Sequence, residues 1–157
     1  MNLFEITIST LPDSVEVYNP LSTEDVSLAL VNDSGWKIYT LINTSCATCI
    51  LQLKEWQDFQ KEIRYIKDVR ILPICYSTDD FEVLKYWFES KNVDSLNFPL
   101  ILDVKNQFIK KNSDLVNDLG EFTALVDHNN HILLTGDPIG STSDRERFLE
   151  KIQESYE

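Results

Sequence analysis

The stretch from Trp36 to Cys49, WKIYTLINTSCATC, contains the change of pattern that decides the fold. Its first eight residues, up to Asn43, are rich in β-branched, aromatic and aliphatic side chains, which predicts a central β-strand. From about residue 47 to 67, apolar side chains recur at steps of three and four, which predicts a long helix. The apolar face of this helix consists of Leu53, Trp56, Phe59, Ile63 and Ile66. Cys46 and Cys49 therefore lie where a strand passes into a helix.

The rest of the chain continues this alternation. Strand patterns cover residues 3–8, 69–76, 98–103, 122–126 and 132–135, and helical patterns cover about 79–91, 105–111 and 142–155. Asp127 to Asn130 are predicted to form a hairpin turn, because Asn tolerates the left-handed backbone that such turns need. Pro73 is unusual within a strand, since proline donates no hydrogen bond to a ladder. The order βαβαβ, then a hairpin and a helix, predicts an α/β sandwich with a mixed central sheet.

Length and composition describe an ordinary globular protein. We expect residues 1–157 to form a single domain, and 43% hydrophobic residues can bury a core without disulfide staples or a structural metal. The net charge of −12 disfavours nucleic acids and anionic membrane surfaces as partners, because phosphates are repelled. This charge serves solubility or favours a basic partner. No run of 18 apolar residues occurs, so no membrane span is predicted.

Cys46 and Cys49 of the segment Cys46-Ala47-Thr48-Cys49 are the candidate catalytic residues. Free N–H groups and the helix dipole stabilise a thiolate at a helix N-terminus, and the thiolate is the nucleophile of disulfide exchange. A step of three residues brings the second thiol onto the same first turn. We therefore expect Cys46 to attack a substrate disulfide and Cys49 to resolve the mixed disulfide.

The cysteines are open to other interpretations. A CxxC pair is also half of a zinc site, but a second ligand pair is missing, and the only histidines are His128 and His131 near a predicted turn. A chance CxxC in a core helix is the third interpretation. Cys75, late in an apolar strand, is predicted to be a core residue rather than a third redox thiol. We expect no metal and no cofactor.

Several segments together resemble thioredoxin-like proteins of the TlpA/ResA type, which are related to the AhpC/TSA proteins. They are Lys37–Glu62 with its CxxC, Leu11-Pro12-Asp13, Tyr76 to Asp80, Phe98-Pro99 with Asp103, and Thr123 to Asp127 with Gly136 to Gly140. The resemblance implies a thioredoxin-like three-layer sandwich and thiol–disulfide oxidoreductase activity. It also implies protein or peptide disulfide and dithiol substrates and a redox partner, usually outside the cytoplasm. Peroxidase chemistry is disfavoured, because neither cysteine follows the Pro and Thr or Ser that peroxiredoxins carry.

The sequence departs from the family pattern at three positions. Gly120, Glu121 and Phe122 occupy the loop that resembles the family's substrate-binding loop, and Glu121 stands where the family has a cis-proline. Glu121 either places a carboxylate near Cys46, raising its pKa, or lies exposed in a shifted loop. Ser45 replaces an aromatic residue before the first cysteine, and Thr40 stands at the position of the buried acid.

These departures keep three functions open. The leading hypothesis is a thiol–disulfide oxidoreductase. The second is a redox-weak or inactive thioredoxin-like binding module, and the third is a thiol-based metal carrier. The resemblance favours a periplasmic or envelope-associated location. Because the first five residues, MNLFE, contain neither a basic region nor an apolar signal core, a cytoplasmic location is also open.

Overall fold

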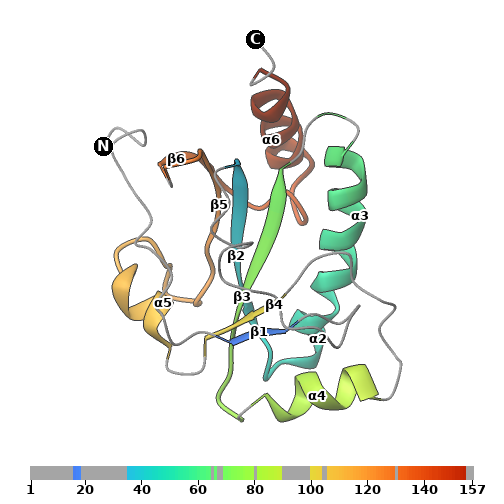
Figure 1. Ribbon diagram of the computed structural model, residues 1–157, viewed down its shortest axis with the longest axis vertical. Coiled ribbons are helices and arrows are strands. Elements are labelled where there is room, and N and C mark those ends of the chain that lie inside the picture. The colour runs from blue at the N-terminus through green and yellow to red at the C-terminus, as the bar shows by residue number, and fades with distance from the viewer. Residues whose placement is uncertain are drawn as a thin grey trace.

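A computed structural model describes residues 16–18, 35–64, 66, 69–79, 81–89, 100–103, 106–129 and 131–154. These residues form a six-stranded sheet with the order β1-β4-β3-β2-β5-β6 (Figure 1). The strands are β1 (Glu16–Tyr18), β2 (Lys37–Asn43), β3 (Arg70–Tyr76), β4 (Leu100–Leu102), β5 (Thr123–Val126) and β6 (Ile132–Thr135). The helices are α2 (Ala47–Ile50), α3 (Gln52–Arg64), α4 (Glu82–Glu89), α5 (Gln107–Lys111) and α6 (Thr142–Glu154).

The sheet is mixed, as predicted. β2, β3 and β4 run parallel, whereas β1 pairs antiparallel with β4, β5 with β2, and β6 with β5. β1 is a correction to the sequence analysis, which predicted no strand at residues 16–18. The strand expected over residues 3–8 and the segments 11–13 and 98–99 lie outside the described residues.

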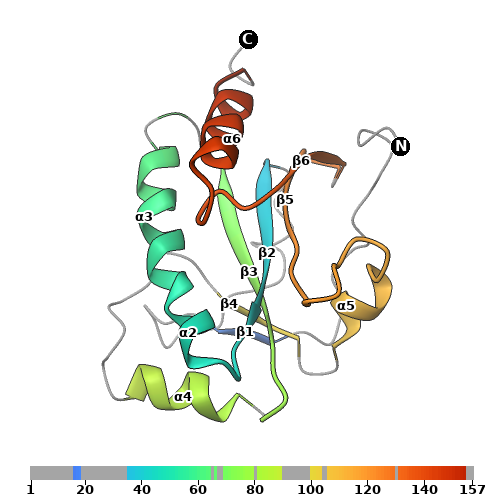
Figure 2. The same ribbon diagram turned by 180° about the vertical axis from the view of Figure 1, so that it is seen from behind.

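Helices cover both faces of the sheet, which completes the expected α/β sandwich. One core cluster joins α3 and α6 to the sheet, and a second joins α5 to the opposite face. Figures 1 and 2 show α3 and α6 on one side of the central strands and α5 on the other. In both views α2 and α4 lie side by side at one end of the sheet. The junction with the two cysteines is therefore at this end.

Alternation within β2 separates the two cores. Ile38 and Ile42 belong to the cluster on the α3 face, and Tyr39 and Leu41 belong to the cluster on the α5 face. This is the two-residue period of a strand that is buried on both faces. The central position predicted for the 36–43 strand is confirmed, since β2 lies between β3 and β5.

The long helix predicted over residues 47–67 is divided in the structure. α2 ends at Ile50, Leu51 keeps a right-handed helical conformation, and α3 continues from Gln52. The predicted apolar face is nevertheless confirmed. Its members on α3 are all buried: Leu53, Trp56, Phe59 and Ile63.

Pro73 lies inside β3, opposite Thr40 of β2. On the other side of β3, the pairing with β4 that the described residues form involves Ile74 and Cys75. Within these residues the ladder begins directly after the proline, so the missing N–H group interrupts none of the described pairing with β4. The strand prediction for residues 69–76 is confirmed despite the proline.

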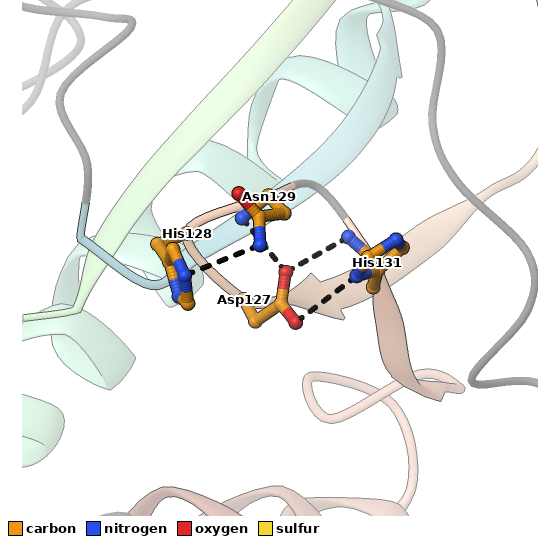
Figure 3. Close-up of polar contacts among 4 residues, drawn as sticks. All are labelled: Asp127, His128, Asn129 and His131. Atoms are coloured by element: carbon orange, nitrogen blue, oxygen red, sulfur yellow. Dashed lines mark hydrogen bonds and ion pairs between the residues drawn. The ribbon is translucent and has the colours of Figure 1, made fainter.

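The turn between β5 and β6 is organised by the side chain of Asp127 (Figure 3). Its Oδ1 atom accepts hydrogen bonds from the backbone N–H of Asn129 at 2.8 Å and of His131 at 3.0 Å. Its Oδ2 atom lies 3.4 Å from Nδ1 of His131, and Nδ2 of Asn129 lies 3.2 Å from Nε2 of His128. The two histidines thus take part in a structural hairpin turn.

Candidate functional site

Cys46 and Cys49 occupy the junction between β2 and α2. Cys46 is the N-cap residue of α2, with extended backbone angles of −110° and 113°, and its Sγ atom accepts a hydrogen bond from the backbone N–H of Cys49 at 3.3 Å. Both cysteines are free thiols and partly exposed to solvent. The sequence prediction that the pair lies at a strand-to-helix junction is confirmed.

The two thiols differ strongly in acidity. Hydrogen bonds from the Cys49 thiol, the Thr48 hydroxyl and the Cys49 backbone N–H lower the pKa of Cys46 to about 7. The Thr48 hydroxyl oxygen lies 3.1 Å from Sγ of Cys46. Burial, followed by the interactions with Cys46, raises the pKa of Cys49 to about 11. At neutral pH about half of the Cys46 thiol is therefore ionised, whereas Cys49 keeps its proton.

The source of this asymmetry is only partly the one expected from the sequence. The sequence argument relied on the free N–H groups and the dipole at the N-terminus of a long helix, but α2 has only four residues. The backbone N–H of Cys49 is such a free group and bonds to Cys46, and the Cys49 thiol and the Thr48 hydroxyl add two donors within the same CxxC turn. Thr48 is thus a site residue that the sequence analysis missed.

Ser45 joins the cysteine turn to the loop after β3. Its hydroxyl donates to Oδ1 of Asp79 at 2.9 Å and accepts from the backbone N–H of Thr78 at 2.8 Å. The Ser77 hydroxyl bonds to the same carboxylate oxygen, and these hydroxyls, Ser77 first, lower the pKa of Asp79. A hydrogen bond from Val83 N–H to Oδ2 of Asp79 extends the network into α4. An aromatic residue at position 45 would lack these bonds.

The loop Gly120-Glu121-Phe122 closes a turn around Asn117. The Asn117 side-chain oxygen accepts from the backbone N–H groups of Leu119 at 3.0 Å and Glu121 at 2.8 Å. The Asn117 N–H in turn donates to the carbonyl of Glu121 at 3.2 Å. Among the described residues no peptide bond is cis. The backbone of Glu121 is held instead by its hydrogen bonds to Asn117.

Tyr76 fixes the same loop from the end of β3. Its hydroxyl points to the carbonyl of Gly120 at 3.4 Å, and a Cβ atom at Gly120 would lie only 2.8 Å from that hydroxyl. Gly120 also has a positive φ of 73°. Burial, followed by the charges of Cys49, Cys46 and Glu121, raises the pKa of Tyr76. The phenol is therefore within the electrostatic reach of both thiols and of the loop.

The sequence left open whether Glu121 lies exposed or places its carboxylate near the cysteines, and in the structure it does both. Its side chain is exposed, and its negative charge contributes to the raised pKa of Cys49. The expectation that the carboxylate raises the pKa of Cys46 is not met, because the pKa of Cys46 is lowered by its hydrogen bonds. Phe122 is buried in the core on the α5 face, and its carbonyl accepts from the N–H of Leu41.

Thr40 is almost completely buried, with 2% of its surface exposed. Its hydroxyl is 2.8 Å from the hydroxyl of Thr123 on β5. Both threonines line a cleft of about 560 Å³, which also borders Trp56, Glu121 and Phe122. A neutral hydroxyl pair thus occupies the place where the family resemblance implies a buried acid.

The remaining candidates are structural. Cys75 is fully buried in the core on the α3 face, and burial raises its pKa far above the usual range. The prediction that Cys75 is a core residue is confirmed. Among the described residues, no group of three or more His, Cys, Asp or Glu side chains is arranged to hold a metal ion.

Tyr76 and Asn117 are the other site residues that the sequence analysis missed. Tyr76 had a usable signal, because parallel strands end at the same edge of a sheet, and Tyr76 pairs with Asn43 at the end of β2. No sequence signal pointed to Asn117, since a polar residue four positions before Glu121 is common in a loop.

No protein-family model matches the sequence, and no curated protein matches it. Solved structures do. StoA from Bacillus subtilis matches with a TM-score of 0.55 and 19% identity, over 78% of this chain and 87% of StoA. The exposed lipoprotein thioredoxin Etrx1 from Streptococcus pneumoniae matches with a TM-score of 0.59 and 14% identity, over 87% of this chain and 97% of Etrx1. AhpC from Mycobacterium tuberculosis matches with a TM-score of 0.61 and 19% identity, over 94% of this chain and 97% of AhpC.

These similarities establish that the chain has a thioredoxin-like fold, as the resemblance in the sequence implied. At identities below 20% they identify the fold alone, and the function has to be argued from the site. In the described part of the chain, no helix has the length and apolar character to cross a membrane.

Proposed function

We propose that this protein is a thiol–disulfide oxidoreductase that cycles Cys46 and Cys49 between dithiol and disulfide. The observation that carries the proposal is the acidity of the pair, with a pKa of about 7 at Cys46 and about 11 at Cys49. A nucleophilic thiol is most effective when its pKa is near the ambient pH, as that of Cys46 is. The three-residue spacing and the shared turn bring the second thiol within reach of the first.

The reaction begins with attack by the Cys46 thiolate on one sulfur of a substrate disulfide. The substrate S–S bond breaks, the mixed disulfide forms, and the leaving thiolate takes a proton from solvent. Cys49 then loses its proton and attacks Sγ of Cys46, which forms the Cys46–Cys49 disulfide and releases the second substrate thiol. The substrate gains two electrons, both from the protein, and two protons, one from solvent and one in place of the proton that Cys49 loses. Run backwards, the same steps oxidise a dithiol.

The loss of the Cys49 proton is the costly step of this cycle. At the position where the family resemblance implies a buried carboxylate that could accept this proton, Thr40 has only a hydroxyl. The charge of Glu121 also raises the pKa of Cys49. Resolution by Cys49 is therefore slower than attack by Cys46 at neutral pH. We expect the mixed disulfide to accumulate during turnover.

We propose protein or peptide disulfides and dithiols as substrates, with a separate redox partner that restores the starting state. Cys46 is partly exposed, which a protein substrate requires. The fold is shared with Etrx1, whose description is an exposed lipoprotein thioredoxin, and this supports an extracytoplasmic location. Fractionating the cells that make the protein distinguishes this location from a cytoplasmic one.

Insulin reduction and a redox titration against glutathione test the exchange activity. The wild type should reduce insulin, Cys46→Ser should abolish the activity, and Cys49→Ser should trap a mixed disulfide. Cys75→Ala is the matched control, because it removes the one cysteine outside the site and should leave the activity unchanged. An inactive wild type, or an active Cys46→Ser variant, contradicts the proposal.

A second candidate is a thioredoxin-like binding module with little redox turnover. It is favoured by the combination of Thr40 with the raised pKa of Cys49, because both slow the resolving step. The two candidates differ in one measurement. A binding module captures substrates as stable mixed disulfides through Cys46 and releases them in hours, whereas an oxidoreductase releases them within seconds.

A further inference from the structure

The cleft that Glu121 borders is negatively charged, and neither Cys46 nor Cys49 is among the residues that line it. Four carboxylates line it, and there is no Lys, Arg or His among its lining residues in the described part of the chain. The carboxylates belong to Asp114, Glu121, Asp137 and Asp144. Asp144 is paired with Arg147 and accepts a hydrogen bond from the N–H of Asp137, so it is largely satisfied within the protein.

Glu121 differs from the other three because it links the cleft to the thiols. It lines the cleft and is exposed, and its charge reaches both Cys49 and Tyr76. Its backbone is fixed by the Asn117 turn, and the neighbouring Gly120 is held against the Tyr76 hydroxyl. Among the described residues its carboxylate makes one weak contact, with Oε2 at 3.4 Å from Nδ2 of Asn117. A well-placed backbone thus presents a carboxylate that is available to a ligand.

The cleft also has an apolar part. Trp56 of α3 and Phe122 line it together with Leu115 and Ile139. Carboxylates beside apolar side chains match the chemistry of Lys and Arg, whose long methylene stems pack on apolar surface while their charged ends stay at its edge. An anionic peptide would meet like charge at the same place.

We propose that Glu121 is a specificity-determining residue that selects substrates carrying Lys or Arg next to the reactive cysteine. The inference rests on the proposed exchange at Cys46 and names the substrate class for that same site. It also explains what a carboxylate does in a loop beside a redox pair, where its charge otherwise only hinders ionisation of Cys49. The gain in substrate recognition offsets that hindrance for cationic substrates, because a bound Lys or Arg neutralises Glu121.

The test uses three matched peptides that differ only in charge. Each has a single cysteine in a mixed disulfide with 2-mercaptoethanol, flanked by two Lys, two Gln or two Glu residues. Rates of exchange with the reduced protein give the preference in reactivity. Dissociation constants of fluorescently labelled forms, with the cysteine replaced by Ala, give the preference in binding without any chemistry.

For the wild type at low salt, we expect the Lys peptide to be preferred over the Gln peptide about fivefold in both measurements, and the Glu peptide to be worst. Glu121→Gln should remove most of this preference, and Glu121→Lys should reverse its order. The preference should also shrink at 0.5 M salt, because surface charge interactions are screened. Asp118→Asn is the matched control, since it removes a charge from the same turn at a residue that does not line the cleft.

Equal behaviour of the three peptides with the wild type overturns the inference. So does an unchanged preference in Glu121→Gln, or an equal loss in Asp118→Asn, which would assign the effect to net charge. Hydroxyethyl disulfide, a small neutral substrate, separates this failure from that of the proposed function. Failure to exchange with it overturns the oxidoreductase proposal, whereas a charge preference in binding still supports the role of Glu121.

Discussion

The backbone N–H of Cys49 donates a hydrogen bond to Sγ of Cys46 at 3.3 Å. The bond holds the outer sulfur at the N-terminus of α2, where it also contacts the hydroxyl of Thr48. Together with the Cys49 thiol, these donors favour the charged form of Cys46. The lowered pKa of Cys46 thus arises within four residues of chain.

Replacing Cys49 by Ala should raise the pKa of Cys46. The pKa is lowered to about 7 chiefly by the Cys49 thiol, and the substitution removes this donor while the backbone N–H remains. The thiolate fraction at pH 7 should fall about fivefold. The rate of iodoacetamide alkylation of Cys46 as a function of pH measures this shift. Cys75→Ala is the control, and its alkylation profile should match that of the wild type.

Replacing Ser45 by Ala should destabilise the protein by about 1 kcal/mol, the usual contribution of a hydrogen-bonding side chain. The substitution removes the bonds to Asp79 and to the Thr78 N–H, which join the cysteine turn to the loop before α4. Ser45→Thr retains the hydroxyl and should recover most of the loss. Urea denaturation measures the free energies of unfolding, with the exposed Ser113→Ala as control. Equal stability of Ser45→Ala and the wild type would show that the network contributes nothing.

Replacing Gly120 by Ala should cost about 2 kcal/mol. A left-handed conformation costs a residue with a side chain roughly 1–2 kcal/mol, and the new Cβ atom would approach the Tyr76 hydroxyl to 2.8 Å. In a Tyr76→Phe background the hydroxyl is absent and the next atom of the ring lies at 3.7 Å. The same substitution should then cost about 1 kcal/mol less. A double-mutant cycle in urea measures this difference, and strict additivity would contradict the contact.

Replacing Gln60 by Leu should destabilise the protein by about 2–6 kcal/mol. Gln60 is buried, and its amide donates to the carbonyl of Val69 at 3.0 Å and accepts from the N–H of Ile71 at 3.1 Å. Leucine fills the space but leaves both backbone groups without these partners, and each unsatisfied buried group costs about 1–3 kcal/mol. Thermal and urea unfolding check the effect. The exposed neighbour Lys61→Ala should change stability by less than about 0.5 kcal/mol.

Much of the fold was predictable from the sequence because its elements have strong local patterns. β2 was predicted from a run of strand-forming residues, and α3 from the spacing of Leu53, Trp56 and Phe59. β1 was not predictable, because three residues in a turn-rich stretch carry no period and become a strand only by pairing with β4. The division of the long helix at Leu51 was also invisible, since Leu51 itself keeps a helical conformation.

The sequence by itself determined the local placement of the two thiols. The CxxC spacing and the change from strand to helix pattern place two thiols on one turn, and both features are local in the chain. Only the tertiary structure decided the surroundings of those thiols. Tyr76 and Glu121 reach them from segments that are distant in the sequence, and their positions depend on the pairing of β2 with β3 and β5. Electrostatic effects on a pKa depend on distance in space, which strand pairing sets and local sequence does not.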